Sequence, residues 1–175
     1  MNKKEFAIIA DTIRTYYPKE NILSNAQAVS LWYEQLKDLS YEVAAATINK
    51  WVSINKWAPT IADIREGAAG LIYGEAKTWG EAWDDTIKAI HAVGLYDVTG
   101  TLDRLDDTTR KVVKQIGVAN ICMSDNGELN TIRAHFKKMY EAEIERQKHY
   151  NQMSPQLKKN IEALQLDKGD TIPPQ

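Results

Sequence analysis

The fold of this chain is decided by residues 41–66, which read YEVAAATINKWVSINKWAPTIADIRE. In the first half of this stretch, apolar or small side chains recur at steps of three and four, as on one face of an α-helix. The stripe consists of Val43, Ala44, Thr47, Ile48, Trp51 and Ile54. Pro59 has no N–H and disfavours helical backbone at Ala58, so the first helix should end before Ala58. Thr60 followed by Asp63 resembles a capping box and predicts the start of a second helix.

Two more amphipathic helices are predicted before this corner. One runs from about Lys3 to Tyr16 and ends near Pro18. The other is capped by Ser24 or Asn25, and its apolar stripe is Ala28, Leu31, Trp32, Gln35 and Leu36. With the two helices of residues 41–66, they predict a compact N-terminal helical bundle within residues 1–74.

Three glycines, Gly67, Gly70 and Gly74, follow closely on one another at the end of this bundle. Each glycine lowers helix propensity by about 1 kcal/mol relative to alanine. We therefore expect either a boundary between two halves of the chain or a continuous helix whose glycines allow close packing.

The rest of the chain is also predicted to be helical. Thr78 and Glu81 form a capping box, and Gly94 and Gly117 are expected to end helices. The predicted helices span about 79–93, 98–105, 107–116, 128–151 and 155–166. The fold class is thus all-α, with an N-terminal bundle (1–74), a second helical region containing a long amphipathic helix (75–166) and a disordered tail (167–175).

Composition narrows the class of protein. The chain has 175 residues, 43% of them hydrophobic, and a formal net charge of −2, so no global positive field draws it onto nucleic acid. Its single cysteine, Cys122, excludes an internal disulfide. There is no apolar run of about 18 residues, so neither a membrane span nor a signal peptide is expected. These features predict a soluble protein of the cytoplasm.

No pattern of catalytic residues stands out. A phosphate-binding glycine loop followed by Lys-Ser/Thr is absent from the sequence. His91, His135 and His149 lack the spacing of a metal site, and Asp84-Asp85 reads as an acidic helix start favoured by the helix dipole. Cys122 reads as a core residue. We therefore expect no enzyme activity, no metal site and no cofactor.

Three stretches carry a family resemblance: residues 57–65 (WAPTIADIR), residues 31–41 (LWYEQLKDLSY) and an opening KKEF followed by Tyr17-Pro18. Together they resemble the N-terminal domain of bacteriophage replicative-helicase loader and inhibitor proteins of Gram-positive hosts, over roughly the first 70 residues. Residues 79–84 (WGEAWD), 109–122 (TRKVVKQIGVANIC) and the run from Arg133 to Tyr140 look like the second half of the longer prophage members.

The resemblance implies a DNA-replication adapter whose partner is the hexameric replicative helicase. Such a protein holds the helicase inactive and delivers it to an origin complex. The N-terminal bundle would engage the origin-bound initiator or regulate release, and the C-terminal portion would grip the helicase. Shorter members of the family are thought to grip it with a flexible C-terminal segment, whereas this chain has strong helix signals there. Because no nucleotide motif is present, the adapter would act through differential affinity for helicase states.

Two sets of candidate binding residues follow. For the helicase grip we select apolar side chains of the last two helices: Phe136, Met139, Tyr140, Ile144, Leu157, Ile161 and Leu164. An amphipathic helix can lay such side chains into a groove, although the same residues could simply close the protein's own core. For an N-terminal partner we select Trp57 and Arg65. Trp57 could either staple the corner or be presented to the partner.

An alternative from another class is a small helical DNA-binding regulator, with the helix–Pro–helix corner as a helix-turn-helix variant. Arg65 is the only basic residue of the second helix before Gly67, which predicts weak or absent direct DNA binding. The basic residues of the long helix, such as Arg133, Lys137 and Lys138, alternate with glutamates and favour a solvated mixed-charge face. Salt dependence separates the two classes, because DNA binding weakens steeply as salt rises.

Overall fold

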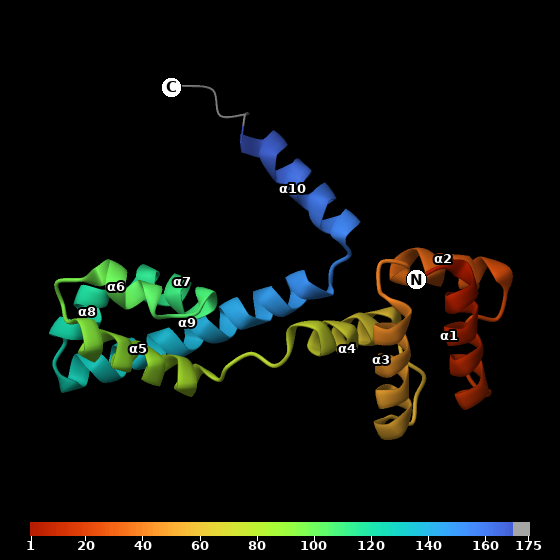
Figure 1. Ribbon diagram of the computed structural model, residues 1–175, viewed down its shortest axis with the longest axis horizontal. Coiled ribbons are helices and arrows are strands. Elements are labelled where there is room, and N and C mark those ends of the chain that lie inside the picture. The colour runs from red at the N-terminus through yellow and green to blue at the C-terminus, as the bar shows by residue number, and fades with distance from the viewer. Residues whose placement is uncertain (170–175) are drawn as a thin grey trace. The chain divides into compact units, whose positions relative to one another are not determined.

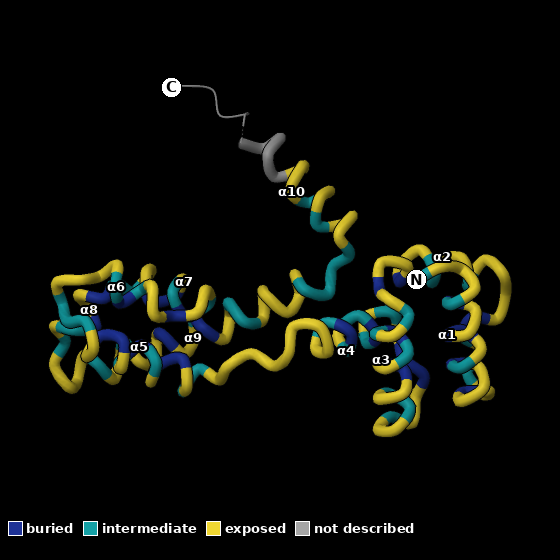
Figure 2. The backbone as a smooth tube through the Cα atoms, viewed as in Figure 1, coloured by how far each residue is buried: buried dark blue, intermediate teal, exposed yellow. Residues whose placement is uncertain are grey.

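The structure is a computed structural model that describes residues 1–169, with side chains through Leu164, and these residues contain ten α-helices and no strand (Figure 1). The predicted all-α class is therefore confirmed. The chain divides into two compact units. Of the described residues, unit 1 comprises 1–74 and 148–169, and unit 2 comprises 75–147. The buried residues form a separate cluster in each unit (Figure 2).

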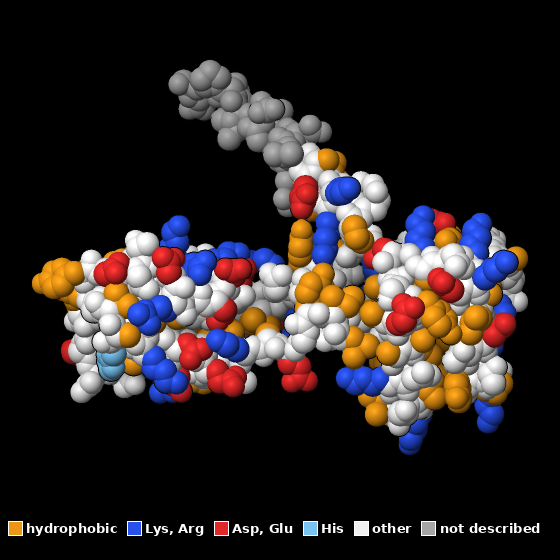
Figure 3. Space-filling view, in the orientation of Figure 1, with side chains coloured by type: hydrophobic (Ala, Val, Ile, Leu, Met, Phe, Trp, Pro, Cys, Tyr) orange, Lys and Arg blue, Asp and Glu red, His pale blue; other side chains and the backbone are white. Residues whose placement is uncertain are grey.

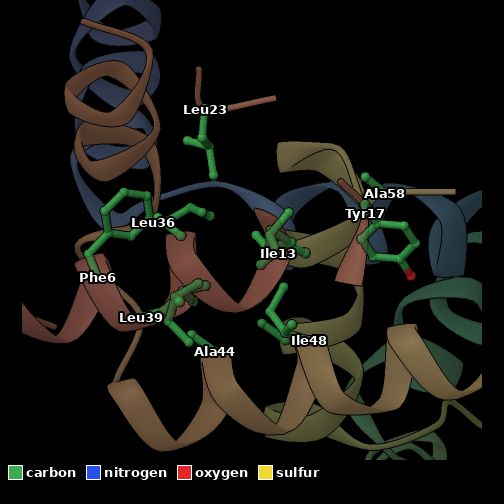
Figure 4. Close-up of a cluster of buried hydrophobic side chains, with 13 residues drawn as sticks. Phe6, Ile13, Tyr17, Leu23, Leu36, Leu39, Ala44, Ile48 and Ala58 are labelled. Carbon is green, nitrogen blue, oxygen red and sulfur yellow. The ribbon is translucent and has the colours of Figure 1, made fainter. Parts of the chain in front are cut away.

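Four helices form the bundle of unit 1: α1 (Lys3–Tyr16), α2 (Ala26–Leu36), α3 (Tyr41–Ile54) and α4 (Ile61–Tyr73). A side chain caps the N-terminus of each helix, from Asn2, Asn25, Ser40 and Thr60 respectively. Thr60 and Asp63 form the predicted capping box, in which the Thr60 N–H donates to the Asp63 carboxylate at 2.8 Å. Apolar side chains from all four helices meet in one core (Figure 4), whose largest fully buried members are Phe6, Ile13, Leu23, Leu36, Ile48 and Ile64.

The connection between α3 and α4 is buried at its centre. α3 ends at Ile54, before the Ala58-Pro59 pair, as the proline predicted. Ala58 and Pro59 are both buried. The indole N–H of Trp51 donates to the Trp57 carbonyl at 2.9 Å, which closes the turn across the end of α3. This hydrogen bond between α3 and the connection therefore fixes the backbone of the connection.

The same corner is also tied to the end of α1. The Tyr17 hydroxyl donates to the Asn55 carbonyl at 3.1 Å, and burial raises the pKa of that hydroxyl, with a further contribution from nearby Glu20. The Ala58 N–H donates to the Glu20 carboxylate at 3.0 Å. Long-range hydrogen bonds therefore satisfy the corner's polar groups where the chain cannot form helix hydrogen bonds.

Three members of the predicted stripes are exposed, Gln35 among them. Ile54, the last residue of α3, is 71% exposed, and Leu31 of α2 is 60% exposed. The face that α2 buries lies one step away from the predicted face, because its inward side chains are Val29, Trp32, Tyr33 and Leu36. The prediction was wrong there since several apolar residues in a row allow more than one helical stripe.

The glycines of α4 have two different roles. The helix is continuous from Ile61 to Tyr73, and Gly74 ends it with a φ of +74°, a conformation that side chains disfavour. A Cβ at Gly67 would lie 2.7 Å from Thr47 Cγ2 of α3, whereas a Cβ at Gly70 would meet nothing within 4 Å. Gly67 therefore permits the close approach of α3 and α4, and Gly74 terminates α4.

We expect Gly67→Ala to lower the free energy of unfolding and Gly70→Ala to raise it. Both substitutions gain about 0.5–1 kcal/mol of helix propensity. At Gly67 the new methyl group meets Thr47, which is buried and whose hydroxyl donates to the Val43 carbonyl at 2.8 Å, and overpacking of this kind costs about 1–3 kcal/mol. Urea unfolding of the two variants measures the difference. An equal gain for both would contradict the tight contact.

Four helices and most of a fifth lie in unit 2: α5 (Trp79–Val93), α6 (Val98–Asp103), α7 (Asp107–Ile116), α8 (Val118–Met123) and α9 (Asn126–Gln152). The Thr78–Glu81 capping box and the helix ends at Gly94 and Gly117 are confirmed. Three rings pack together in the core: the Trp83 and Phe136 centroids are 5.2 Å apart, and the Phe136 and Tyr140 centroids are 5.7 Å apart. This aromatic column joins α5 to α9.

The last helix, α10, spans Pro155–Gly169. The disordered tail predicted for residues 167–175 lies outside the described residues from 170 onward. Residues 167–169 complete α10, because no glycine or proline interrupts the chain between Pro155 and Gly169. None of the described helices is long and apolar enough to cross a lipid bilayer.

A polar network binds the segment before α5 to unit 2. The Lys77 ammonium lies 2.7 Å from the Asp85 carboxylate and 3.6 Å from that of Asp106. The Tyr140 hydroxyl donates to the Lys77 carbonyl at 3.2 Å. Burial alone would raise the pKa of Asp106, but hydrogen bonds from the Thr109 N–H and hydroxyl, with the Lys77 charge, outweigh burial and lower that pKa.

We expect Asp106→Asn to lower the free energy of unfolding at pH 7 by about 1 kcal/mol, because the ion pair and one charge-assisted hydrogen bond are lost. The folded state lowers the pKa of Asp106, so its contribution is present above the unfolded pKa, near 4, and disappears as pH falls through the folded pKa. The difference between variant and wild type should therefore shrink on acidification.

Urea unfolding at pH 7 and near pH 3 measures that difference. Asp107→Asn is the control, since the Asp107 side chain is 98% exposed and should contribute little at either pH. An Asp106→Asn loss of the same size at both pH values would contradict a role for the charged carboxylate.

Candidate binding surfaces

In the part of the chain that the structure describes, the side chains that could ligate a metal do not lie together in one place. No three histidine, cysteine, aspartate or glutamate side chains are grouped there so that they could hold a metal ion. His91, His135 and His149 are exposed on helix surfaces. Cys122 is half-buried against the core of unit 2, and burial raises the pKa of its thiol, which disfavours the reactive thiolate. The candidate sites are the surfaces formed by the residues that the sequence analysis selected for partner binding.

Trp57 is presented to solvent at the α3–α4 corner. Its side chain is 74% exposed, although its carbonyl is held by Trp51. Ile54, three residues earlier, and Tyr16, at the end of α1, are also exposed. The Tyr17–Asn55 hydrogen bond brings the end of α1 to this corner. A rigid backbone therefore displays large apolar side chains at one end of the bundle.

Positive charge surrounds these side chains. Lys50, Lys56 and Lys19 are exposed and form no ion pair among the described residues. No acidic residue occurs between Glu42 and Asp63. We call this region the corner surface, made of Tyr16, Lys19, Lys50, Ile54, Lys56 and Trp57. Figure 3 shows orange and blue, without red, at the end of the bundle where α1 and α3 finish.

Arg65, unlike the exposed Trp57, is held in the fold by an ion pair. Its side chain is only 11% exposed, and its guanidinium donates to both carboxylate oxygens of Asp38 at 3.2 and 2.9 Å. Asp38 lies in the connection between α2 and α3, so the pair fastens α4 to that connection. The predicted partner-binding role of Arg65 is not supported by this geometry, because its donors are already engaged.

We expect Arg65→Ala to lower the free energy of unfolding by about 1–2 kcal/mol, because the substitution removes the bidentate charge-assisted hydrogen bonds to Asp38, whose side chain is 22% exposed. Trp57→Ala should change it by no more than about 0.5 kcal/mol, since an exposed side chain contributes little packing. Thermal or urea unfolding compares the two. A large loss for Trp57→Ala would assign Trp57 to the fold instead of to a surface.

The residues predicted for a helicase grip are divided by the structure into two groups. Phe136 and Tyr140 are buried in unit 2, and Met139 and Ile144 pack partly buried against the same core. This burial agrees with the alternative left open for these four residues, that they close the protein's own core, and their contact with a helicase stays a prediction. On α10, Leu157 and Leu164 are exposed and Ile161 is partly buried.

The three apolar residues of α10 share one face, which we call the α10 stripe. Their spacing of four and then three residues places Leu157, Ile161 and Leu164 in one row along the helix. Leu164 is 64% exposed. The α10 stripe is thus the part of the predicted grip that remains available to a partner.

The basic residues of α9 are partly engaged with unit 2. The Arg133 guanidinium and the Lys137 ammonium lie 5.4 and 5.0 Å from the centroid of the Trp79 ring. Lys137 also lies 3.9 Å from the Glu141 carboxylate. This arrangement fits the mixed-charge face that the sequence favoured better than a continuous track for a phosphate backbone.

Sequence reasoning missed the exposed Tyr96 and Met123, which are next in sequence to residues that line a groove of unit 2. Neither residue belongs to a periodic pattern that would have singled it out. Their exposure follows only from the way in which the short helices α6 and α8 pack.

Comparison with known proteins gives one match. Residues 1–65 match the family model for the N-terminal domain of the helicase loader and inhibitor of phage SPP1. This region comprises α1, α2, α3 and the first residues of α4, and so includes the corner surface. No curated protein and no solved structure shows a significant match to the chain.

Proposed function

We propose, from the match of residues 1–65 to a phage helicase-loader family, that this chain is a replication adapter. It binds a hexameric replicative helicase in the cytoplasm of the bacterial host, holds it inactive and delivers it to the origin complex. The observation that carries this proposal is the family match, which extends over the bundle that presents Trp57.

The corner surface and the α10 stripe, which lie far apart in the sequence, suggest a division of labour. The corner surface combines an exposed tryptophan with three unpaired lysines, and tryptophan is enriched in the centres of protein interfaces. Such a surface suits an acidic and partly apolar region of a second replication protein, for which the origin-bound initiator is our candidate. The α10 stripe suits an apolar groove on the helicase.

Adapter action of this kind needs no nucleotide site on the chain. A protein that binds one conformation of the helicase more tightly than another shifts the population toward that conformation by the difference in binding free energy. A preference of about 1.4 kcal/mol changes the ratio of the two states tenfold. Release would then follow when ATP turnover or the initiator favours the other conformation.

A second candidate function, a DNA-binding regulator, rests on the positive charge of the corner surface. Two observations disfavour it. Arg65, the basic residue of the helix after the corner, is bound to Asp38, and a recognition helix needs free polar groups for base edges. Ile54 and Trp57 instead supply apolar area, which a protein partner buries more readily than duplex DNA.

The test is light scattering coupled to size-exclusion chromatography. The purified protein is mixed with the host's hexameric helicase at moderate salt, with and without ATP. We expect a complex whose amount depends on nucleotide, because the adapter distinguishes helicase states. Absence of any complex would contradict the proposal, and salt-sensitive binding to DNA would then favour the regulator.

Leu157→Asp combined with Leu164→Asp tests the α10 stripe. We expect this double variant to weaken the complex at least about tenfold, since charges on the stripe would have to be desolvated in the interface. The matched control is Ile8→Asp with Leu31→Asp, which alters two exposed apolar residues of α1 and α2. If both double variants bind equally well, the α10 stripe does not contact the helicase.

A further inference from the structure

A groove opens on unit 2 between the second half of α5, α8 and the start of α9. Its volume is about 850 Å³, which lies within the range of pockets that bury a ligand. Apolar side chains contributed by these elements and by the α5–α6 connection line it: Trp83, Ile87, Ile90, Leu95, Ile121 and Leu129. The groove belongs wholly to unit 2.

Two large, exposed apolar residues neighbour lining residues in the sequence. Tyr96 follows the lining residue Leu95 and is fully exposed. Met123 lies between the lining residues Cys122 and Ser124 and is 74% exposed. Tyrosine and methionine are enriched in protein interfaces, and methionine adapts its shape to a partner. Both side chains are exposed close in sequence to the lining.

The charged side chains at the groove are mostly cationic. Lys88, on α5, and Arg133, on α9, both line it, and His91 lies one turn beyond Lys88. Asp84 is the one carboxylate among the described lining residues. Lys88 forms no ion pair with any described residue, and Arg133 is positioned over the Trp79 ring. The groove is therefore apolar inside and positive at its edges.

We propose that this groove binds an amphipathic helix of the replicative helicase, with apolar side chains on one face and carboxylates beside them. This inference rests on the proposed function and specifies the chemistry of the partner. The apolar face would fill the groove, and its carboxylates would meet Lys88 and Arg133. The chain's own α10 matches less well, because Lys158 and Lys159 accompany its apolar residues and would face like charge.

Cys122 provides a direct probe of occupancy. It is the only cysteine of the chain and it lines the groove. The full-length protein is treated with N-ethylmaleimide at about pH 8, with and without excess helicase whose own cysteines are blocked beforehand. At a free helicase concentration of about ten times Kd, roughly a tenth of the grooves stay open, so alkylation of Cys122 should slow about tenfold.

A charge reversal provides the second readout. Lys88→Glu should weaken the complex about tenfold or more, because it places like charge opposite the partner's carboxylates. The control is Lys114→Glu on α7, which is likewise exposed, lies outside the lining and should bind like the wild type. Circular dichroism of both variants establishes that they are folded.

The outcomes separate this inference from the proposed function. Slower alkylation together with weaker binding by Lys88→Glu supports the groove. A complex in which Cys122 reacts at the unbound rate and Lys88→Glu binds normally overturns the groove while helicase binding stands. Absence of any complex overturns both. If Cys122 is alkylated more slowly as the concentration of the protein rises in the absence of helicase, the proposal is overturned. That result would assign the groove to contact with a second copy of the chain.

Discussion

The closed turn between α3 and α4 is the constraint on which unit 1 depends. Pro59 forces the chain out of helical backbone, and the freed polar groups are satisfied by Trp51, Tyr17 and Glu20. The turn brings α4 against α3, where Gly67 allows the two helices to touch at Thr47. The same hydrogen bonds hold the backbone of Trp57 while its ring stays in solvent. One set of contacts therefore determines both the packing and the display of Trp57.

Unit 2 is held together in a different way. The column of Trp83, Phe136 and Tyr140 joins α5 to α9, and the Tyr140 hydroxyl fixes the segment before α5 through the Lys77 carbonyl. Between α7 and α9, Glu143 is only 12% exposed and pairs with Lys111 and Arg146. Because each unit has its own core, a partner bound to one unit need not disturb the other. That independence suits an adapter with two partners.

The local signals in the sequence were sufficient for most helix boundaries. Capping boxes and terminal glycines act within four residues, so Thr60, Thr78 and Gly117 could be interpreted without knowledge of the fold. The face that each helix buries was less certain. Leu31 is apolar and lies next to Trp32, and only the packing of α2 against α1 and α4 decides which of the two is covered.

The candidate sites were harder to predict, because they depend on contacts between distant residues. From the sequence, Arg65 was a candidate for partner binding. In the fold its guanidinium pairs with Asp38, which lies 27 positions earlier in the sequence. Phe136 and Tyr140 read as an apolar face of a long helix, and the structure places α5 against that face. The groove of unit 2 combines residues of three helices that share no motif. For Trp57 the sequence left two interpretations open, a ring that packs on the corner or a ring presented to a partner, and the structure exposes the ring.

The central claim is that the corner surface and the C-terminal part of the chain bind different partners, with the helicase bound by the C-terminal part. Hydrogen exchange of the full-length protein, measured by mass spectrometry with and without the helicase, tests it most directly. The account predicts slower exchange in α8, the start of α9 and α10, and unchanged exchange between Ile54 and Thr60. Slower exchange confined to the α3–α4 corner would contradict the account, since it would assign the helicase to the corner surface.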